Sequence, residues 1–268
     1  MQSAVLTEQE FRQFQTMLYE IAGISLTPAK QALVSGRLAR RLKHYGLHSY
    51  GEYFRLLSQR EEPQELQVAI DLLTTNETYF FREPKHFDLL RDTILPGLGG
   101  SQPVRVWSGA CSSGEEVYTI AMVMAERLGD RPWEIFGSDI STQVLERARS
   151  GHYPIERAEN IPQQYLSKYC LKGVGAQAGT FLIDRALRNR VRFQQVNLNA
   201  PLPQLGEFDV IFLRNVMIYF DQKTKQQVVR RMLPLLRSGG YFLVSHSESL
   251  NGISDSLKLI SPSVYRKP

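Results

Sequence analysis

Two acidic residues follow a turn of small residues near the middle of the chain, and an aspartate follows the next apolar run. The turn is Ser108–Glu116, which reads S-G-A-C-S-S-G-E-E, and the aspartate is Asp139 at the end of E-I-F-G-S-D. Carboxylates at such a turn repel a pyrophosphate and suit a ligand with cationic and hydroxyl groups. Asp139 is also placed to accept hydrogen bonds from both hydroxyls of a ribose.

Each of these features has a structural explanation as well, and two nucleotide-binding patterns are missing here. The turn contains no G-x-G-x-x-G, and no Lys-Ser/Thr follows Gly114, which argues against a dinucleotide fingerprint and a P-loop. Glu115 and Glu116 would stabilise the first turn of any helix, and Asp139 could be the N-cap of a helix over Thr142–Arg149. Together, the three features favour an adenosyl ligand without phosphates, and S-adenosylmethionine is the obvious candidate.

Strands and helices alternate around these side chains. Apolar runs predict strands over residues 104–107, 135–136, 191–195, 208–213 and 241–245, and a closing hairpin over 257–265. Helical spacing predicts helices over 84–95, 117–128, 142–149 and 221–236, the last ended by Gly239 and Gly240. This alternation over residues 84–268 predicts an α/β fold with a doubly wound, mostly parallel sheet and a ligand at the carboxyl ends of its strands.

Residues 1–75 show only helical spacing of apolar residues, which predicts a small all-α domain. The helix expected over about residues 28–45 contains no Asp or Glu and carries five cations, Lys30, Arg37, Arg40, Arg41 and Lys43. A solvated basic face is one explanation. An acidic protein surface would also match this charge, and so would the phosphates of a nucleic acid.

Two further segments interrupt the pattern. Residues 76–83 link the domains and hold Asn76, Thr78 and Arg82, polar groups that a plain linker does not need. Residues of about 152–190 contain a predicted short helix, a glycine-rich turn over Gly173–Gly179 and a strand-like run over 180–183. We predict that they form a small inserted β-subdomain, whose open edge could add a peptide strand.

Composition limits the remaining possibilities. The 268 residues carry a formal net charge of +5 and only two cysteines, which is neither a disulfide framework nor a metal-ligand cluster. No apolar run is long enough to span a bilayer, and residues 1–14 lack the apolar core of a signal peptide. We therefore expect a cytoplasmic protein that does not insert into a membrane.

Six motifs occur in a fixed order along the chain. They are T-N-E-T-Y-F-F-R (Thr75–Arg82), S-G-A-C-S-S-G-E-E (Ser108–Glu116), S-D-I-S (Ser138–Ser141), V-N-L (Val196–Leu198), R-N-V-M-I-Y-F (Arg214–Phe220) and S-H-S-E (Ser245–Glu248). Together they resemble the CheR-type chemotaxis receptor methyltransferases, which methylate glutamate side chains on the cytoplasmic helices of receptors. The resemblance covers nearly the whole chain. It implies a Rossmann-like class I S-adenosylmethionine-dependent methyltransferase domain with an inserted small β-subdomain, preceded by a small all-α N-terminal domain.

The resemblance also implies roles for individual residues, and no metal. Arg82 and Tyr219 would be catalytic, close to the transferred methyl group. The acidic receptor helices would be bound by Lys30, Arg37, Arg40, Arg41 and Lys43. The cofactor would be bound by Asn76, Thr78, Arg82, Gly109, Glu116, Asp139, Asn197, Leu198, Arg214 and Asn215. Family members usually have proline after the glutamate pair, where this chain has Val117.

A glutamate substrate suits these residues. Its carboxylate is already ionised at neutral pH, with a reference pKa of about 4.3, so no general base is required, and the motifs contain no His-Asp pair. The enzyme must instead align the carboxylate with the methyl group. Arg82 could do so, although too tight a pair would stabilise the ground state. Tyr219 could alternatively pack under the cofactor, and we interpret His246 as a satisfied core histidine.

Other functions compete with this interpretation. A nucleic-acid methyltransferase would share the fold and the positive charge, but enzymes that methylate base amino groups resemble one another in an Asn/Asp-Pro-Pro-aromatic run, where this chain has residues 213–216, L-R-N-V. A non-catalytic S-adenosylmethionine-binding regulator would not need Arg82 and Tyr219. In some family members the β-subdomain binds a short peptide at the receptor C-terminus. The compact turn Gly173–Gly179 resembles that of these members, and the resemblance implies peptide binding here. We expect a monomer that does not bind nucleic acid.

Overall fold

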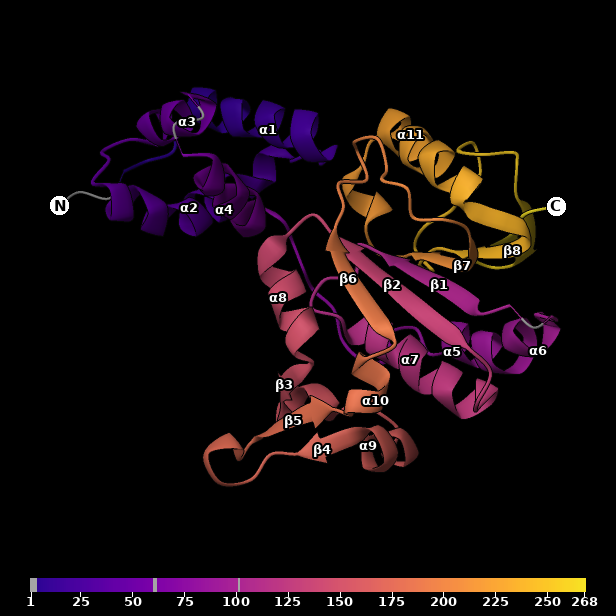
Figure 1. Cartoon of the computed structure of the whole chain (residues 1–268). Helices are drawn as coiled ribbons and strands as arrows, with labels where there is room; N and C mark the ends of the chain where they lie inside the picture. Colours follow the sequence, from indigo (N-terminus) through magenta and orange to yellow (C-terminus); the bar gives the residue numbers. More distant parts are fainter. Residues whose placement is uncertain (1–3, 60–61, 101) are drawn as a thin grey trace.

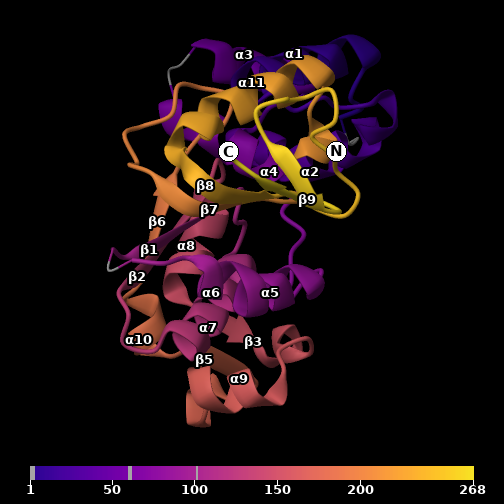
Figure 2. The same cartoon turned by 90° about the vertical axis from the view of Figure 1, so that its right-hand side faces the viewer.

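A seven-stranded sheet forms the centre of the C-terminal part of the chain (Figures 1 and 2). The computed structural model describes residues 4–59, 62–100 and 102–268. The sheet order is β6-β2-β1-β7-β8-β10-β9. The strands are β1 (Val104–Gly109), β2 (Trp133–Asp139), β6 (Val191–Gln195), β7 (Phe208–Leu213), β8 (Leu236–Leu243), β9 (Lys258–Ser261) and β10 (Val264–Arg266). The five strands from β6 to β8 are parallel, and the β9–β10 hairpin adds to β8 in the antiparallel sense.

Helices cover both faces of this sheet because successive residues of its strands point to opposite sides. Val210 and Phe212 of β7 pack in one apolar cluster with α5 (Lys85–Leu89) and α7 (Glu115–Leu128). Ile211 and Leu213 pack in a second cluster with α11 (Gln222–Met232). Figure 1 shows α5, α6 and α7 below the sheet and α11 above it. The predicted Rossmann-like, mostly parallel arrangement is thus confirmed.

The remaining helices of this part connect the strands. A π-helical turn, Leu90–Ile94, and α6 (Leu95–Gly97) continue α5, so that the predicted helix over 84–95 is one helical segment. After β2, α8 (Thr142–Ser150) leads into the inserted segment, and α10 (Arg185–Arg188) leads out of it into β6. Among the described residues, no helix is both long and apolar enough to cross a membrane.

The inserted segment forms its own small antiparallel sheet, as predicted. Its order is β3-β5-β4, with β3 (His152–Pro154), β5 (Thr180–Ile183) and β4 (Cys170–Lys172). It projects from the main sheet beside α9 (Gln163–Tyr169) (Figure 1). Phe181 and Tyr153 of this sheet pack in the same cluster as Phe80 and α7, so the β-subdomain is anchored to the larger domain by apolar contact.

Two neighbouring predicted elements have different bounds in the structure. The helix expected to run from 221 to Gly239–Gly240 ends at Met232, where a 3-10 turn over Leu233–Leu235 follows. Pro234 lies in this turn, and proline cannot continue an α-helix because it lacks the N–H donor. The two glycines lie inside β8, which begins at Leu236 and ends at Leu243 rather than running from 241 to 245.

The N-terminal part consists of α1 (Glu8–Ala22), a 3-10 turn (Pro28–Lys30), α2 (Gln31–Tyr45), α3 (Tyr50–Gln59) and α4 (Pro63–Leu73). These helices have a separate apolar core, which includes Phe14, Leu38 and Tyr53. The part lies over the sheet edge where α8 begins (Figures 1 and 2). Gln67 and Asp71 of α4 hydrogen-bond to Ile140 and Thr142, and this fixes the position of α4 against the α/β part.

The predicted basic helix is α2, but its charges are partly compensated inside the domain. Arg41 donates to the buried carboxylate of Glu65 on α4, at 2.7 Å from Nε to Oε1. Arg37 donates to the backbone carbonyls of Leu73 and Thr74. Arg37 and Arg41 therefore join α2 to α4, while Lys30, Arg40 and Lys43 are exposed. The predicted helix contains no acidic residue, yet Arg41 is paired, because its partner Glu65 is far away in the sequence.

Glu65→Gln is expected to lower the free energy of unfolding by about 1–3 kcal/mol at neutral pH. Burial would raise the pKa of Glu65, but hydrogen bonds from Arg41 and Tyr53 outweigh it and hold the pKa below the ordinary value of 4.5. A depressed folded-state pKa means that the stabilisation is present above the unfolded-state pKa and is lost as the pH falls through the folded-state pKa. Urea denaturation at neutral pH and at about pH 3 should therefore show that the difference in free energy of unfolding between the wild type and Glu65→Gln is smaller at the lower pH.

A matched control for this experiment is Glu8→Gln. Glu8 forms an exposed ion pair with Arg12 on α1, and such pairs contribute about 0–1 kcal/mol. An equal loss of unfolding free energy in the two variants would contradict the structural role of Glu65. A loss in Glu65→Gln that does not change with pH would contradict it too.

Candidate active site

A cavity of about 290 Å³ lies at the carboxyl ends of β1, β2 and β7. Its walls come from these strand ends, from the segment that links α4 to α5, and from the segment between α1 and α2 of the N-terminal part. The predicted residues that line it are Asn76, Thr78, Arg82, Glu116, Asp139, Asn197, Leu198, Arg214, Asn215 and Tyr219. Residues distant in the sequence thus meet at one place because the ends of parallel strands share one edge of the sheet.

Gly109 is the one predicted pocket residue that does not line the cavity. It is the last residue of β1, and a Cβ placed there would lie 3.3 Å from Met232 Cε and 3.4 Å from Leu213 Cδ1. Gly109 therefore permits close packing of β1 against the α11 side of the sheet. The residues that face the cavity at this turn are Ala110, Cys111 and Ser112.

The turn between β1 and α7 uses left-handed backbone conformations. Ala110, Ser112 and Gly114 have φ angles of 58°, 49° and 93°. A Cβ at Gly114 would lie 2.9 Å from the Cβ of Ala148 and 3.1 Å from the hydroxyl of Tyr153. Only glycine fits without strain at this position, because both the φ angle and the space exclude a side chain.

Gly114→Ala is expected to destabilise the fold by about 2–4 kcal/mol, which combines the left-handed conformation with overpacking. Gly36→Ala is the matched control, because Gly36 lies inside α2 with nothing within 4 Å of the added Cβ. There alanine should stabilise by roughly 0.5–1 kcal/mol. Relative to the wild type, the urea midpoint should fall for Gly114→Ala and rise for Gly36→Ala. A neutral Gly114→Ala would mean that the turn can relax around the extra methyl group.

Asp139 lies at the end of β2, with both carboxylate oxygens bound to backbone. Oδ2 accepts from Ser112 N and Oδ1 from Ser141 N, each at 2.9 Å. The N-cap of α8 is Ser141, whose hydroxyl accepts from Val144 N, so Asp139 is not the N-cap that one interpretation of the sequence allowed. Burial raises the pKa of Asp139 above its ordinary value, although these backbone donors lower it. The carboxylate thus faces the cavity in a fixed orientation.

An ion network with a buried arginine and two half-buried glutamates crosses the floor of the cavity. Arg214 Nη1 donates to Glu116 Oε2 at 2.9 Å, and Nη2 lies 3.1 Å from Glu83 Oε2. Nη2 also donates to the carbonyl of Arg82, and Ser108 Oγ donates to the other oxygen of Glu116. Burial raises the pKa of Glu116 despite Arg214. Burial also acts to raise the pKa of Glu83, but the charge and hydrogen bond of Arg214 together with the contacts of His246 outweigh it, so that the pKa of Glu83 is lowered. One arginine therefore neutralises two carboxylates.

The loop after β7 carries Arg214, Asn215 and Tyr219, and Glu248 holds it in place. The carboxylate of Glu248 accepts from three backbone amides, those of Asn215 at 3.0 Å, Ile218 at 3.2 Å and Ser245 at 2.9 Å. Asn215 has a φ of 58°, a conformation that needs such support. We did not assign roles to Glu83 and Glu248 from the sequence. Their positions in the motifs were the available signal, since Glu83 directly follows T-N-E-T-Y-F-F-R and Glu248 is the last residue of S-H-S-E.

The segment between α4 and α5 supplies the rim. Arg82 Nη1 donates to the carbonyl of Glu77 at 3.0 Å, and its guanidinium lies 5.6 Å from the centre of the Tyr79 ring. The backbone carbonyl of Asn76 accepts from Ser112 Oγ, which ties the segment to the β1–α7 turn. Among the described residues, no carboxylate forms an ion pair with Arg82.

The N-terminal part closes the cavity opposite the sheet, which the sequence did not predict. Ser25 N donates to the carbonyl of Tyr219 at 2.8 Å, and Ile24 forms an isolated β-bridge with Phe220. Asn197 Nδ2 donates to the carbonyl of Ile21.

Of the five cations assigned to substrate binding, Lys30 lines the cavity, whereas Arg37, Arg40, Arg41 and Lys43 do not.

These residues fit S-adenosylmethionine in chemical type. Asp139 offers acceptors for ribose hydroxyls, Glu116 offers negative charge for cationic groups, and aliphatic walls surround them. Arg214 Nε is buried and has no hydrogen-bond partner within the described part of the chain. A buried donor of this kind needs an acceptor, and a ligand carboxylate would supply one.

Comparison with known proteins identifies two family models along the chain. The model described as "CheR methyltransferase, all-alpha domain" matches residues 9–74, and the model described as "CheR methyltransferase, SAM binding domain" matches residues 76–266. The "Chemotaxis protein methyltransferase 2" of Pseudomonas aeruginosa is 44% identical over 97% of this chain and 93% of its own length. The "Chemotaxis protein methyltransferase" of Escherichia coli is 43% identical over 97% of this chain and 91% of its own length.

The expected family resemblance is thereby confirmed, together with an all-α domain followed by a domain that binds S-adenosylmethionine. The relatives also support an enzyme that methylates, rather than a non-catalytic regulator with the same pocket. The chain belongs to the CheR methyltransferase family.

Proposed function

We propose that this enzyme transfers a methyl group to glutamate side chains on the cytoplasmic helices of chemoreceptors and forms glutamate methyl esters. The observation that carries this proposal concerns Arg82 at the rim of the cavity. Among the residues that the structure describes, no carboxylate pairs with it. The other lining arginine, Arg214, is already paired with Glu116 and Glu83. A substrate carboxylate can take the vacant position beside Arg82 through a charge-assisted hydrogen bond.

The residues around the cavity also support a reaction without a general base. No histidine occurs among the described residues that line the cavity, and a glutamate with a reference pKa of about 4.3 needs none. Bound S-adenosylmethionine would supply the methyl group from its sulfonium. A carboxylate oxygen of the substrate would bond to the methyl carbon, and the electron pair of the broken carbon–sulfur bond would stay on sulfur in the product S-adenosylhomocysteine. Arg82 and Tyr219 would orient the attacking carboxylate, while the α1–α2 segment excludes water from the cavity. Exclusion of water strengthens the electrostatic alignment.

Residues for the cofactor follow from the same geometry. We propose that Asp139 binds the ribose hydroxyls and that Glu116, Asn76 and Thr78 bind other polar groups. Arg214, Asn215, Asn197 and Leu198 would complete the pocket. No role in cofactor binding is proposed for Gly109, since it packs away from the cavity.

Receptor contact would involve the exposed cations of the N-terminal part. Lys30, Arg40 and Lys43 are exposed on or next to α2 and can meet an acidic helix, whereas Arg37 and Arg41 are occupied within the domain. Binding of a receptor C-terminal peptide at the β-subdomain remains a prediction, and the edge strand β4 with its exposed Leu171 is the place for it.

The test is Arg82→Ala, assayed for methyl-ester formation on a receptor cytoplasmic fragment. We expect the turnover number to fall about 10²-fold or more, which corresponds to about 2.7 kcal/mol. Calorimetric affinity for S-adenosylhomocysteine should stay within a few-fold, and Arg82→Lys should recover only part of the rate because lysine lacks the bidentate fork.

Arg12→Ala is the control, because Arg12 is exposed on α1. Wild-type turnover in Arg82→Ala would reject the role of Arg82. Methylation of receptor fragments at groups other than glutamate would reject the proposed substrate.

A further inference from the structure

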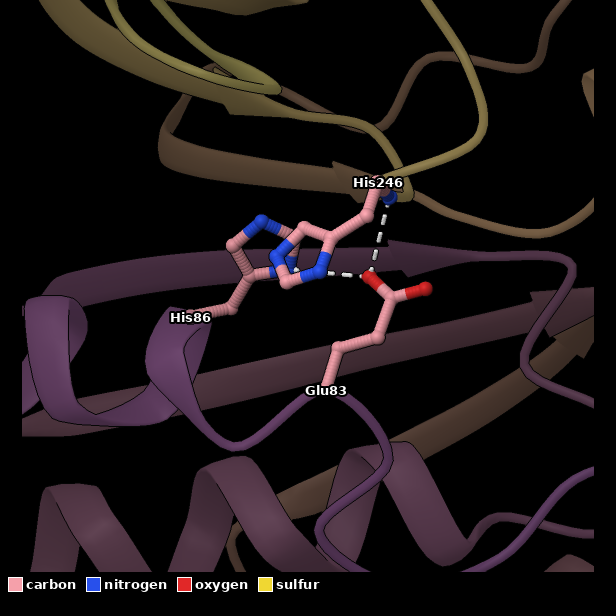
Figure 3. Close-up of side chains that lie close together, drawn as sticks. All are labelled: Glu83, His86 and His246. Atoms are coloured by element: carbon pink, nitrogen blue, oxygen red, sulfur yellow. Dashed lines mark hydrogen bonds and ion pairs between the residues drawn. The ribbon is translucent and has the colours of Figure 1, made fainter.

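Three side chains outside the cavity walls converge behind Arg214. Glu83 follows the rim residue Arg82, His86 lies on the first turn of α5, and His246 lies in the loop after β8. Their candidate ligand atoms lie within 4.8 Å of one another. Figure 3 shows both imidazole rings next to Glu83, with the marked contacts from the two histidines meeting on one carboxylate oxygen. His246 is exposed, so its interpretation as a satisfied core histidine was wrong.

The contacts around His86 favour one of its two neutral tautomers. Ser263 Oγ donates to the carbonyl of Pro262 at 2.5 Å, so this oxygen is an acceptor toward His86 Nε2, which lies 2.7 Å away. This arrangement favours the neutral tautomer with the hydrogen on Nε2 and a lone pair on Nδ1. Nδ1 is buried and has no hydrogen-bond partner in the described part of the chain, and the whole residue is 2% exposed.

This lone pair faces another acceptor. His86 Nδ1 lies 3.4 Å from Glu83 Oε2. Glu83 is half-buried, and its Oε2 already has Arg214 Nη2 at 3.1 Å and the amide of His246 at 3.2 Å as partners. Neither of these groups satisfies the buried Nδ1 of His86, and a cation bound to both Nδ1 and Oε2 would do so. The separation of 3.4 Å is also close to the spacing of two ligands that share one metal ion at about 2.0–2.2 Å.

The surrounding contacts have the form of a metal site. Ser263 accepts from the far nitrogen of His86, and this kind of contact orients a ligating histidine. His246 N donates to Glu83 Oε2 at 3.2 Å, which holds the loop of the second histidine against the carboxylate. The exposed ring of His246 can rotate to complete the ligand set.

We propose that Glu83, His86 and His246 bind a divalent transition-metal ion, with Zn²⁺ the best match. Two imidazoles and one carboxylate are ligands that Zn²⁺ accepts, and a water molecule would complete a tetrahedral site. The carboxylate of Glu83 also contacts Arg214, which in turn holds Glu116. Metal at this site would therefore compete with Arg214 for Glu83 and would link the site to the cavity floor.

The test uses the full-length, untagged, metal-free protein and Zn²⁺ alone, followed by calorimetry. We expect one site per chain in the wild type. His246→Ala should weaken it at least tenfold, and the exposure of this ring makes the variant safe for folding. His48→Ala is the matched control, since His48 is an exposed histidine in the N-terminal part, and it should bind as the wild type does.

Co²⁺ provides a second readout that does not depend on methyl transfer. Visible absorption of a tetrahedral Co²⁺ complex should appear in the wild type and in His48→Ala and should be lost in His246→Ala. Equal Zn²⁺ affinity in all three proteins would overturn the proposal, because the ion would then bind elsewhere. No binding to the wild type would overturn it too.

Discussion

Arg214→Met is expected to lower the free energy of unfolding by about 3–5 kcal/mol, the cost of leaving buried charges without their partner. The variant would leave the half-buried carboxylates of Glu116 and Glu83 without Arg214, the buried cation that now pairs with both. Its side chain also covers Phe87, with the guanidinium 5.3 Å from the ring centre. Methionine retains much of the apolar contact, so the loss should arise from the charge. Urea denaturation at neutral pH measures it.

The same variant should respond to pH in a defined direction. Burial already raises the pKa of Glu116, and removal of Arg214 would raise it further. A protonated carboxyl needs no cation, so the deficit of the variant should shrink as the pH falls and carboxyls become protonated.

Arg237→Met is the control for Arg214→Met. Arg237 pairs with Asp209 at 2.7 Å in the same domain, but a third of its side chain is exposed. Such a pair contributes about 0–1 kcal/mol. Equal losses in the two variants would show that Arg214 is an ordinary ion-pair partner and would remove it as the organising charge of the cavity floor.

Asp139→Asn is expected to weaken binding of S-adenosylhomocysteine about 10²-fold or more. Hydrogen bonds to a charged group contribute about 1.5–3 kcal/mol each, and two ribose hydroxyls would be affected. An amide also cannot accept from both Ser112 N and Ser141 N, the two donors that now hold the carboxylate. One of them would meet the NH₂ group, so the side chain would lose its orientation as well as its charge. Calorimetry measures the change.

The pKa of Asp139 adds a pH test of the same role. Burial raises the pKa of this carboxyl, and a ligand that donates two hydrogen bonds binds its ionised form. Affinity in the wild type should therefore fall as the pH falls toward this raised pKa. Asp139→Asn should show a weaker pH dependence, because Glu116, whose pKa burial also raises, is still present in the pocket. Asp184→Asn is the control, since Asp184 accepts from Ala186 N at the start of α10 in the β-subdomain. Unchanged affinity in Asp139→Asn would reject the ribose contact.

The order of strands and helices was predictable because it depends on local patterns. The runs over 191–195 and 208–213 became β6 and β7 with the predicted bounds, and the insertion over 152–190 became a separate small sheet. The site residues were predictable for a related reason. Asp139 is the last residue of β2 and Arg214 directly follows β7. Both strands end at the same edge of the sheet, so the two residues converge once the sheet is parallel.

The misplaced boundary at the end of α11 has an equally local cause. The prediction ended that helix at the glycine pair, although Pro234 lies before it and interrupts the helix first. Gly109 does not line the cavity, and its sequence position alone could not show this, because a glycine at the end of a strand can serve either a ligand or packing. Only the positions of Met232 and Leu213 in space decide between them.

What the sequence by itself determined is the class of fold, the family, and the polar groups at the strand ends, since periodicity and motif spacing are properties of short segments. Only the tertiary structure decided how the charges are paired. Arg41 is paired with Glu65, Arg214 with Glu83 and Glu116, and His86 meets Glu83 and Ser263. It also placed the α1–α2 segment over the cavity, through Ser25 and Tyr219. Each of these contacts depends on packing between distant segments, because a charge is satisfied by what lies within a few ångströms in space and not by its neighbours in the chain.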